Sequence, residues 1–144
     1  ILATFDYKRF LGLNRCAPSF LDVYKNRLAI SDLGAHVLST WEIEESDQSG
    51  TIIPLNHISV GNRPMGALPP RGGGGPPPPF GKCRFISGVQ LDENGYVMVA
   101  DADGATLQIF SPALECLCRV HPVNPISDKI PYVSDFVVIS VSDL

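Results

Sequence analysis

An internal repeat without gaps dominates this sequence. The segments 19–32 and 88–101 match along their whole length, and their last residues, Asp32 and Asp101, lie 69 positions apart. Each segment predicts a short apolar strand, a tight turn, and a second apolar strand that ends in a small residue and an aspartate. Because an offset match of this length is a stronger signal than any single motif, the chain is expected to consist of stacked copies of one β-unit.

The repeat continues beyond these segments. Alternating apolar and polar residues predict a third strand over 37–41 and over 106–110. These strands end in Trp41 and Phe110, which again lie 69 positions apart and are expected to pack between neighbouring units. In the turn of the second copy, Gly95 is a residue that tolerates the positive φ that tight hairpins need.

The distance between the copies indicates the kind of unit. The offset includes a Pro- and Gly-rich stretch, and removing it leaves a period of about 43 residues, which is that of a four-stranded propeller blade. A third copy is predicted to begin near the C-terminus, where Val141-Ser142-Asp143 echoes Ile30-Ser31-Asp32. The expected organisation is therefore 1–59 (the end of one unit and the first complete unit), 60–82 (a disordered insertion), 83–125 (the second unit) and 126–144 (the start of a third).

The pattern resembles the NHL repeat. Gly88 through Asp101 is similar to the family motif of apolar strand, Asn-Gly turn and apolar strand ending in Asp, and Pro18 through Trp41 is a fair match with His36 near the family's Asn-His position. The similarity is greatest to the NHL domains at the C-termini of tripartite-motif proteins. It implies an all-β fold, an open fragment of a β-propeller with two fairly complete blades, parts of flanking blades, and a disordered Pro/Gly-rich insertion.

Few residues suggest catalysis. An aspartate that recurs in every unit is expected to accept backbone N–H bonds in the following turn, because a catalytic acid is needed only once. The scaffold positions of the repeat are predicted to be Asp32, Trp41, Gly95, Asp101 and Phe110. No catalytic residue is assigned.

Metal and cofactor sites are not expected either. The three histidines, His36, His57 and His121, lie in separate segments without ligand spacing. Cys116 and Cys118 form a C-x-C pair that strand alternation would place on one face as small buried hydrophobes. With only four cysteines, a reducing, cytoplasmic compartment is favoured.

The resemblance locates a binding face. In NHL geometry one face collects the loops before the first strand and after the second, and Arg15 and Arg84 are equivalent basic residues of these loops. The expected binding face comprises Arg15, Ser19, Phe20, Leu33, His36, Lys82, Arg84, Ser87 and Asp103. The chain is accordingly expected to be a macromolecule-binding module, part of a larger tripartite-motif-type ubiquitin ligase whose RING lies elsewhere, or of a post-transcriptional regulator.

The partner expected first is a protein, and single-stranded RNA is the second class. The net charge of −4 argues weakly against a chain that coats nucleic acid by bulk charge. No apolar run reaches the length of a membrane span, so no membrane partner is expected. The prolines in 64–80 could dock in a proline-recognition module, although an insertion without a partner is the simpler interpretation.

The alternative function is a fragment of an NHL-like propeller enzyme, a metal-dependent lyase or hydrolase, with metal ligands supplied by other blades.

Overall fold

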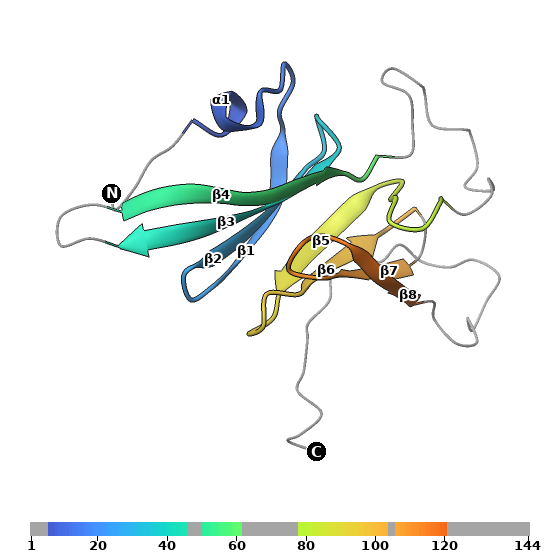
Figure 1. Cartoon of the computed structure of the whole chain (residues 1–144). Helices are drawn as coiled ribbons and strands as arrows, with labels where there is room; N and C mark the ends of the chain where they lie inside the picture. The colour runs from blue at the N-terminus through green and yellow to red at the C-terminus, as the bar shows by residue number, and fades with distance from the viewer. Residues whose placement is uncertain (1–5, 46–49, 62–77, 104–105, 121–144) are drawn as a thin grey trace.

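The computed structural model describes residues 6–45, 50–61, 78–103 and 106–120, and shows a chain made of two antiparallel sheets and one short helix (Figure 1). Sheet 1 has the strand order β1-β2-β3-β4, and sheet 2 has the order β5-β6-β7-β8. The bounds are α1 (Tyr7–Leu11), β1 (Pro18–Tyr24), β2 (Arg27–Asp32), β3 (Val37–Glu45), β4 (Gly50–Ser59), β5 (Ile86–Leu91), β6 (Val97–Asp101), β7 (Thr106–Phe110) and β8 (Cys116–Val120). The all-β class expected from the sequence is confirmed.

Several sequence predictions concern other parts of the chain. The tail of a preceding unit at 1–5, most of the insertion at 62–77, and the third unit at 126–144 lie outside the described residues. Within the described residues, the two sheets do not close into a ring. Val60, which falls inside the predicted insertion, is buried in the core.

The helix α1 has no counterpart in the sequence predictions. Asp6 caps its N-terminus by accepting a hydrogen bond from the backbone N–H of Arg9, and Gly12 ends it with a left-handed φ of 62°. Aspartate before the first turn and glycine just after the last are the residues that such ends favour. The helix is too short to persist by itself, so its packing on sheet 1 must hold it in place.

The two sheets repeat each other with a one-residue shift in the first strand. In sheet 1, Leu21 pairs with Ile30, whereas in sheet 2 Val89 pairs with Val99. Ile30 and Val99 are 69 positions apart, but their partners Leu21 and Val89 are only 68 apart. The gapless sequence match therefore aligns the second strands correctly in space and misaligns the first strands by one residue.

Turn length explains the shift. In sheet 1, Tyr24 pairs with Arg27 and encloses a two-residue turn, in which Lys25 has a φ of 53°. In sheet 2, the backbone N–H of Asp92 donates to the Tyr96 carbonyl and encloses three residues. The last of these is Gly95, whose φ of 86° few other residues adopt readily. The extra turn residue moves β5 by one position relative to its sequence counterpart.

A β-bulge repeats as well. The register shifts between Thr40 and Trp41 in sheet 1, and at the equivalent step between Ile109 and Phe110 in sheet 2. The bulge has a consequence for the two neighbouring cysteines of β8. Cys116 pairs with Phe110 and packs against the core, while Cys118 pairs with Ile109 and is exposed. The expectation of two buried cysteines on one face is therefore wrong, because an inserted residue breaks the strand alternation.

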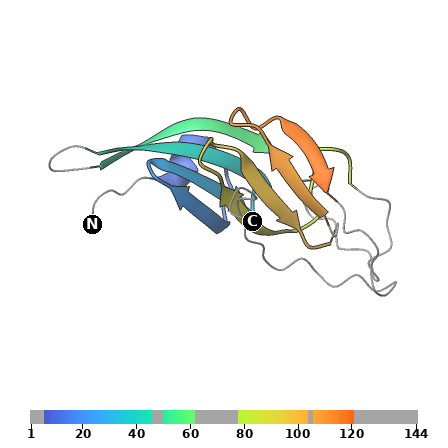
Figure 2. The ribbon, with the colours of Figure 1, turned by 90° about the horizontal axis from the view of Figure 1, so that it is seen from below.

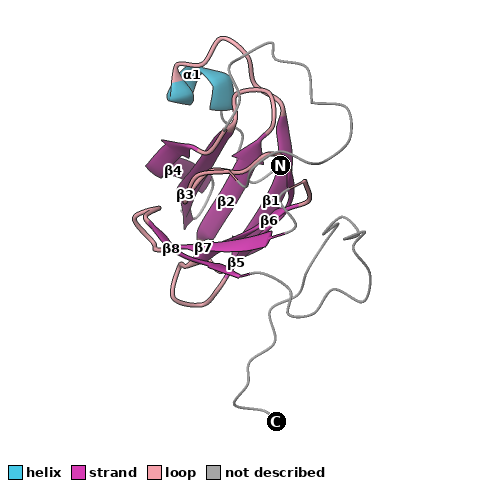
Figure 3. Cartoon of the chain, turned by 90° about the vertical axis from the view of Figure 1, so that its right-hand side faces the viewer, coloured by secondary structure: helices cyan, strands magenta, loops and turns pink. Residues whose placement is uncertain are grey.

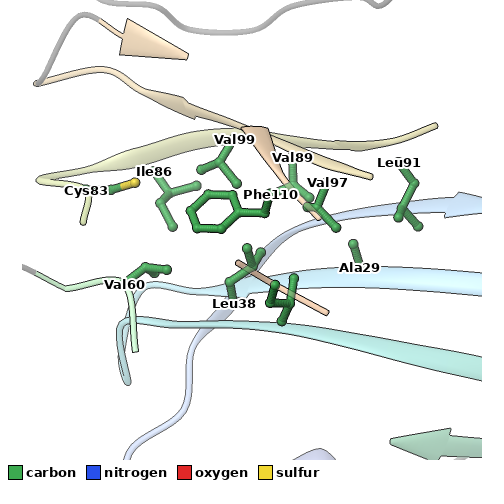
Figure 4. Packing of buried hydrophobic residues seen from close by; sticks show 11 residues of the cluster. Ala29, Leu38, Val60, Cys83, Ile86, Val89, Leu91, Val97, Val99 and Phe110 are labelled. Atoms are coloured by element: carbon green, nitrogen blue, oxygen red, sulfur yellow. The ribbon is translucent and has the colours of Figure 1, made fainter. Parts of the chain in front are cut away.

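The core lies between the two sheets. Ala29 and Leu38 of sheet 1 meet Val89, Val99 and Phe110 of sheet 2 in one buried cluster (Figure 4). The outer ends of β3 and β4 extend past sheet 2, as Figures 1 and 2 show. Across the contact, the Asn56 side-chain amide donates to the Pro112 carbonyl at 3.2 Å. Burial of this cluster is the main force that joins the sheets.

A second, smaller cluster occupies the opposite side of sheet 1. Leu28, Ile30 and Trp41 are buried there beneath Tyr7 and Leu11 of α1. Figure 3 shows α1 beside the β3 and β4 side of the sheet. Trp41 and Phe110, which are equivalent in the repeat, therefore have different neighbours: Phe110 packs on sheet 1, and Trp41 packs on α1.

Candidate binding surface

One end of the two sheets, here called the loop end, gathers the loops that the sequence analysis singled out. At this end β1 begins beside the last residue of β2, with Pro18 opposite Asp32, and β5 begins beside the last residue of β6, with Ile86 opposite Asp101. The sheets are joined here through Val60, which donates its N–H to the His36 carbonyl at 2.9 Å and accepts from Cys83 N–H at 2.7 Å. The loops of both sheets therefore lie at one end of the molecule.

A buried aspartate holds each set of loops from inside. Asp32 Oδ1 accepts hydrogen bonds from the backbone N–H groups of Ala17 and Ala35, both at 2.8 Å. Both oxygens of Asp101 are used in the same way, because Oδ2 accepts from Arg84 N–H at 3.0 Å and Oδ1 from Phe85 N–H at 2.9 Å. Both side chains are fully buried, so they shape the loops without reaching a ligand.

Several residues of the expected binding face have partners within the structure. Phe20 and Leu33 pack against the main core cluster. Ser87 is buried and donates to the Ala100 carbonyl, while the hydroxyl of Ser19 donates to the Ala17 carbonyl. The ammonium of Lys82 donates to the Ser59 carbonyl. These contacts give the five residues local structural partners at the loop end.

The remaining predicted residues are at least partly accessible. Arg15 is exposed, and His36, Arg84 and Asp103 are partly exposed. His36 has a φ of 54°, and its side chain lies so close to Gly61 that a Cβ added there would be 2.6 Å from the His36 Cβ. Its side chain thus packs closely against the segment that links the two sheets.

Phe85 belongs to this surface and was missed by the sequence analysis. Its side chain is 48% exposed, although it follows Arg84 in the loop that Asp101 holds. In the sequence it is an aromatic residue directly before an apolar strand, a pattern that does not distinguish an exposed ring from a buried one. An exposed aromatic beside a basic residue offers both a flat apolar contact and a charge.

The thiols and histidines do not form a metal site among the described residues, which contain no group of three or more potential ligands. Burial raises the pKa of the Cys83 thiol to about 12, and burial also raises the pKa of Cys116. Both thiols contact Gln108, whose side-chain amide also accepts from Gly81 N–H and donates to the Lys82 carbonyl. This arrangement keeps the thiols protonated and suits a structural role.

Comparison with known proteins adds no assignment: no protein-family model and no curated protein sequence matches the chain. Among the described residues, the structure has no helix with the length and apolar character of a membrane span.

Proposed function

We propose that the two sheets are adjacent blades of a β-propeller similar to the NHL type, and that the chain is a macromolecule-binding module that uses its loop end. The support is the repetition between the sheets. Both are four-stranded antiparallel meanders with the same strand order, and both carry a bulge at the same step of the third strand. Side-by-side packing of such units through apolar faces is typical of propellers.

The observation that carries the binding role is the pair of buried aspartates. Asp32 and Asp101 hold equivalent loops from inside, which leaves Arg15 on one loop and the Arg84–Phe85 pair on the other at the same end. Residues presented by loops on a rigid scaffold are the usual binding elements of such folds. The ligand proposed first is a protein segment that lies across both loops.

A binding experiment on the whole chain tests this role. A displayed library of random peptides is selected on the protein, and the binding of the enriched peptides is then measured. Arg15→Glu and Phe85→Ala are expected to weaken that binding at least tenfold. Lys25→Glu is the matched control, because it makes the same charge change in the exposed turn at the opposite end of sheet 1. Equal losses in all three variants, or no enriched peptide, would exclude the loop end as a peptide-binding surface.

Single-stranded RNA is the second candidate ligand, and the exposed Phe85 beside Arg84 is the observation that favours it. Unpaired bases stack on aromatic side chains, and basic residues neutralise the phosphates. Retention of a random single-stranded RNA pool on filters is measured across a salt series. The expected result is retention at physiological salt that Phe85→Ala weakens and Lys25→Glu leaves unchanged. Absence of retention at that salt would exclude RNA.

A further inference from the structure

Sheet 2 buries one apolar face, here called the docking face, against sheet 1. Its side chains come from β5, β6 and β7, and Phe110 lies at its centre (Figure 4). The docking face consists of Val89, Leu91, Val97, Val99 and Phe110. Val89 and Leu91 keep only 6% and 7% of their surface exposed, because sheet 1 covers them.

Sheet 1 carries the same face on the side that points away from sheet 2. Directly opposed residues of an antiparallel pair share one face. Leu21 pairs with Ile30 and Val23 pairs with Leu28, as Val89 pairs with Val99 and Leu91 with Val97. The equivalent face of sheet 1 therefore consists of Leu21, Val23, Leu28, Ile30 and Trp41.

This second face is only half covered. The rings of Tyr7 and Phe10 lie with their centroids 5.7 Å and 6.0 Å from that of Trp41, so α1 covers the part of the face formed by β2 and β3. The part formed by β1 is open: Leu21 is 65% exposed and Val23 is 48% exposed. The two first-strand positions that are buried between the sheets in sheet 2, Val89 and Leu91, are thus exposed to solvent in sheet 1.

The complement of this face is also repeated. Sheet 1 receives sheet 2 with Ala29 and Leu38, supported by Ile58, which lies opposite Leu38 in the register. The equivalent residues of sheet 2 are Met98, Leu107 and Val120, with Val120 opposite Leu107. They lie on the side of sheet 2 that faces away from sheet 1, where Val120 is 46% exposed and the other two are partly exposed.

We propose that the open face of sheet 1 docks a second copy of this chain, which presents the Met98–Leu107–Val120 side of its sheet 2. The contact repeats between molecules the packing that joins the two sheets within one molecule. Because two different faces meet, the association is head to tail. The assembly keeps one free face of each kind at its two ends after each added copy, until it closes into a ring. In the free chain α1 occupies part of the same face, so docking displaces it from Trp41.

Sedimentation velocity of the full chain over a concentration series tests the proposal. The unmodified protein is expected to form species larger than a monomer as its concentration rises. Leu21→Glu and Val120→Glu each damage one of the two faces, so each variant alone is expected to stay monomeric. Phe80→Glu is the control, because Phe80 is 58% exposed and lies outside both sheets, and this variant should associate like the unmodified chain.

Mixing the two damaged variants gives the sharper result. The intact face of the Val120→Glu chain can still receive the intact face of the Leu21→Glu chain, so a 1:1 mixture is expected to form a heterodimer that grows no further. Far-UV circular dichroism must first show that both variants retain the strand content of the unmodified chain. A monomeric unmodified protein at every concentration, or a mixture that stays monomeric, would overturn the proposal. Association of each variant alone would overturn it too.

Discussion

The carboxylate of Asp22 on β1 accepts a hydrogen bond from the backbone N–H of Leu91 on β5, with 2.8 Å between Oδ2 and N. A side chain of sheet 1 thereby satisfies a main-chain donor on the edge strand of sheet 2. Charged acceptors form stronger hydrogen bonds than neutral ones, and a buried N–H without a partner is costly. The bond adds a directional contact to the apolar packing and helps to fix how the two sheets meet.

Asp22→Ala is therefore expected to lower the free energy of unfolding by about 1–2 kcal/mol. Asp22→Asn keeps an acceptor oxygen and should lose less than half of that. Urea denaturation followed by circular dichroism measures both values. Glu93→Ala, in the exposed turn of sheet 2, is the control and should change little. Equal stability of Asp22→Ala and the unmodified protein would show that the bond contributes nothing.

Asp101→Ala should cost more, about 2–3 kcal/mol, because it leaves the N–H groups of Arg84 and Phe85 without their acceptor. The loop that carries these residues is also expected to loosen. Hydrogen exchange at the two amides measures this directly, and both should exchange faster in the variant. Unchanged exchange at these amides would contradict the assigned role, even if overall stability fell.

Phe110→Ala removes the centre of the packing between the sheets and is expected to cost about 3–5 kcal/mol. Phe110→Leu keeps most of the apolar volume and should cost much less. Chemical denaturation of both variants gives the comparison. Similar losses for the two would indicate that the shape of the ring matters more than its burial.

Alkaline pH should destabilise the fold. Burial raises the pKa of Tyr7 from 10.0 to about 12 and that of Cys83 from 9.0 to about 12. Between these values the unfolded chain has released protons that the folded chain still holds, so the free energy of unfolding falls as pH rises from about 9 to about 12. Below pH 9 both groups are neutral in both states, and the contribution is fully present.

Denaturation curves at pH 8, 9.5 and 10.5 measure this fall. Tyr7→Phe and Cys83→Ala each remove one titrating group, so each should flatten the dependence while also shifting stability at pH 8. Tyr24→Phe is a control for tyrosines in general. A dependence that stays equally steep in both variants would assign the effect to other groups.

The sequence predicted the strands well because the repeat shows the same pattern twice. The apolar runs that became β2 and β6, and the alternating runs that became β3 and β7, were placed by periodicity and by their equivalence. Gly95 marked a turn because few other residues adopt its φ readily. These features are local, and local preference agrees with the final fold.

What the sequence did not reveal depends on contacts between distant segments. The helix α1 is too short to be stable by itself. It is held by aromatic contacts of Tyr7 and Phe10 with Trp41, a residue that lies about 30 positions later in the chain. The inward orientation of Phe20 follows from the register of β1, which the gapless match misaligned by one residue. Phe85 was missed because burial cannot be read from an aromatic that directly precedes an apolar strand.

The unequal turns of the two hairpins have a consequence for recombining the repeat. In each hairpin the turn length matches the positions of the apolar residues in the first strand. Leu21 and Val89 occupy equivalent positions opposite Ile30 and Val99, although the turns that follow them have two and three residues. A chimera that exchanges whole hairpins would keep each first strand with the turn length that its apolar pattern requires. A crossover inside the turn would join a strand to the wrong turn and invert every side chain of that strand, so the hairpin is the smallest unit that this repeat can exchange.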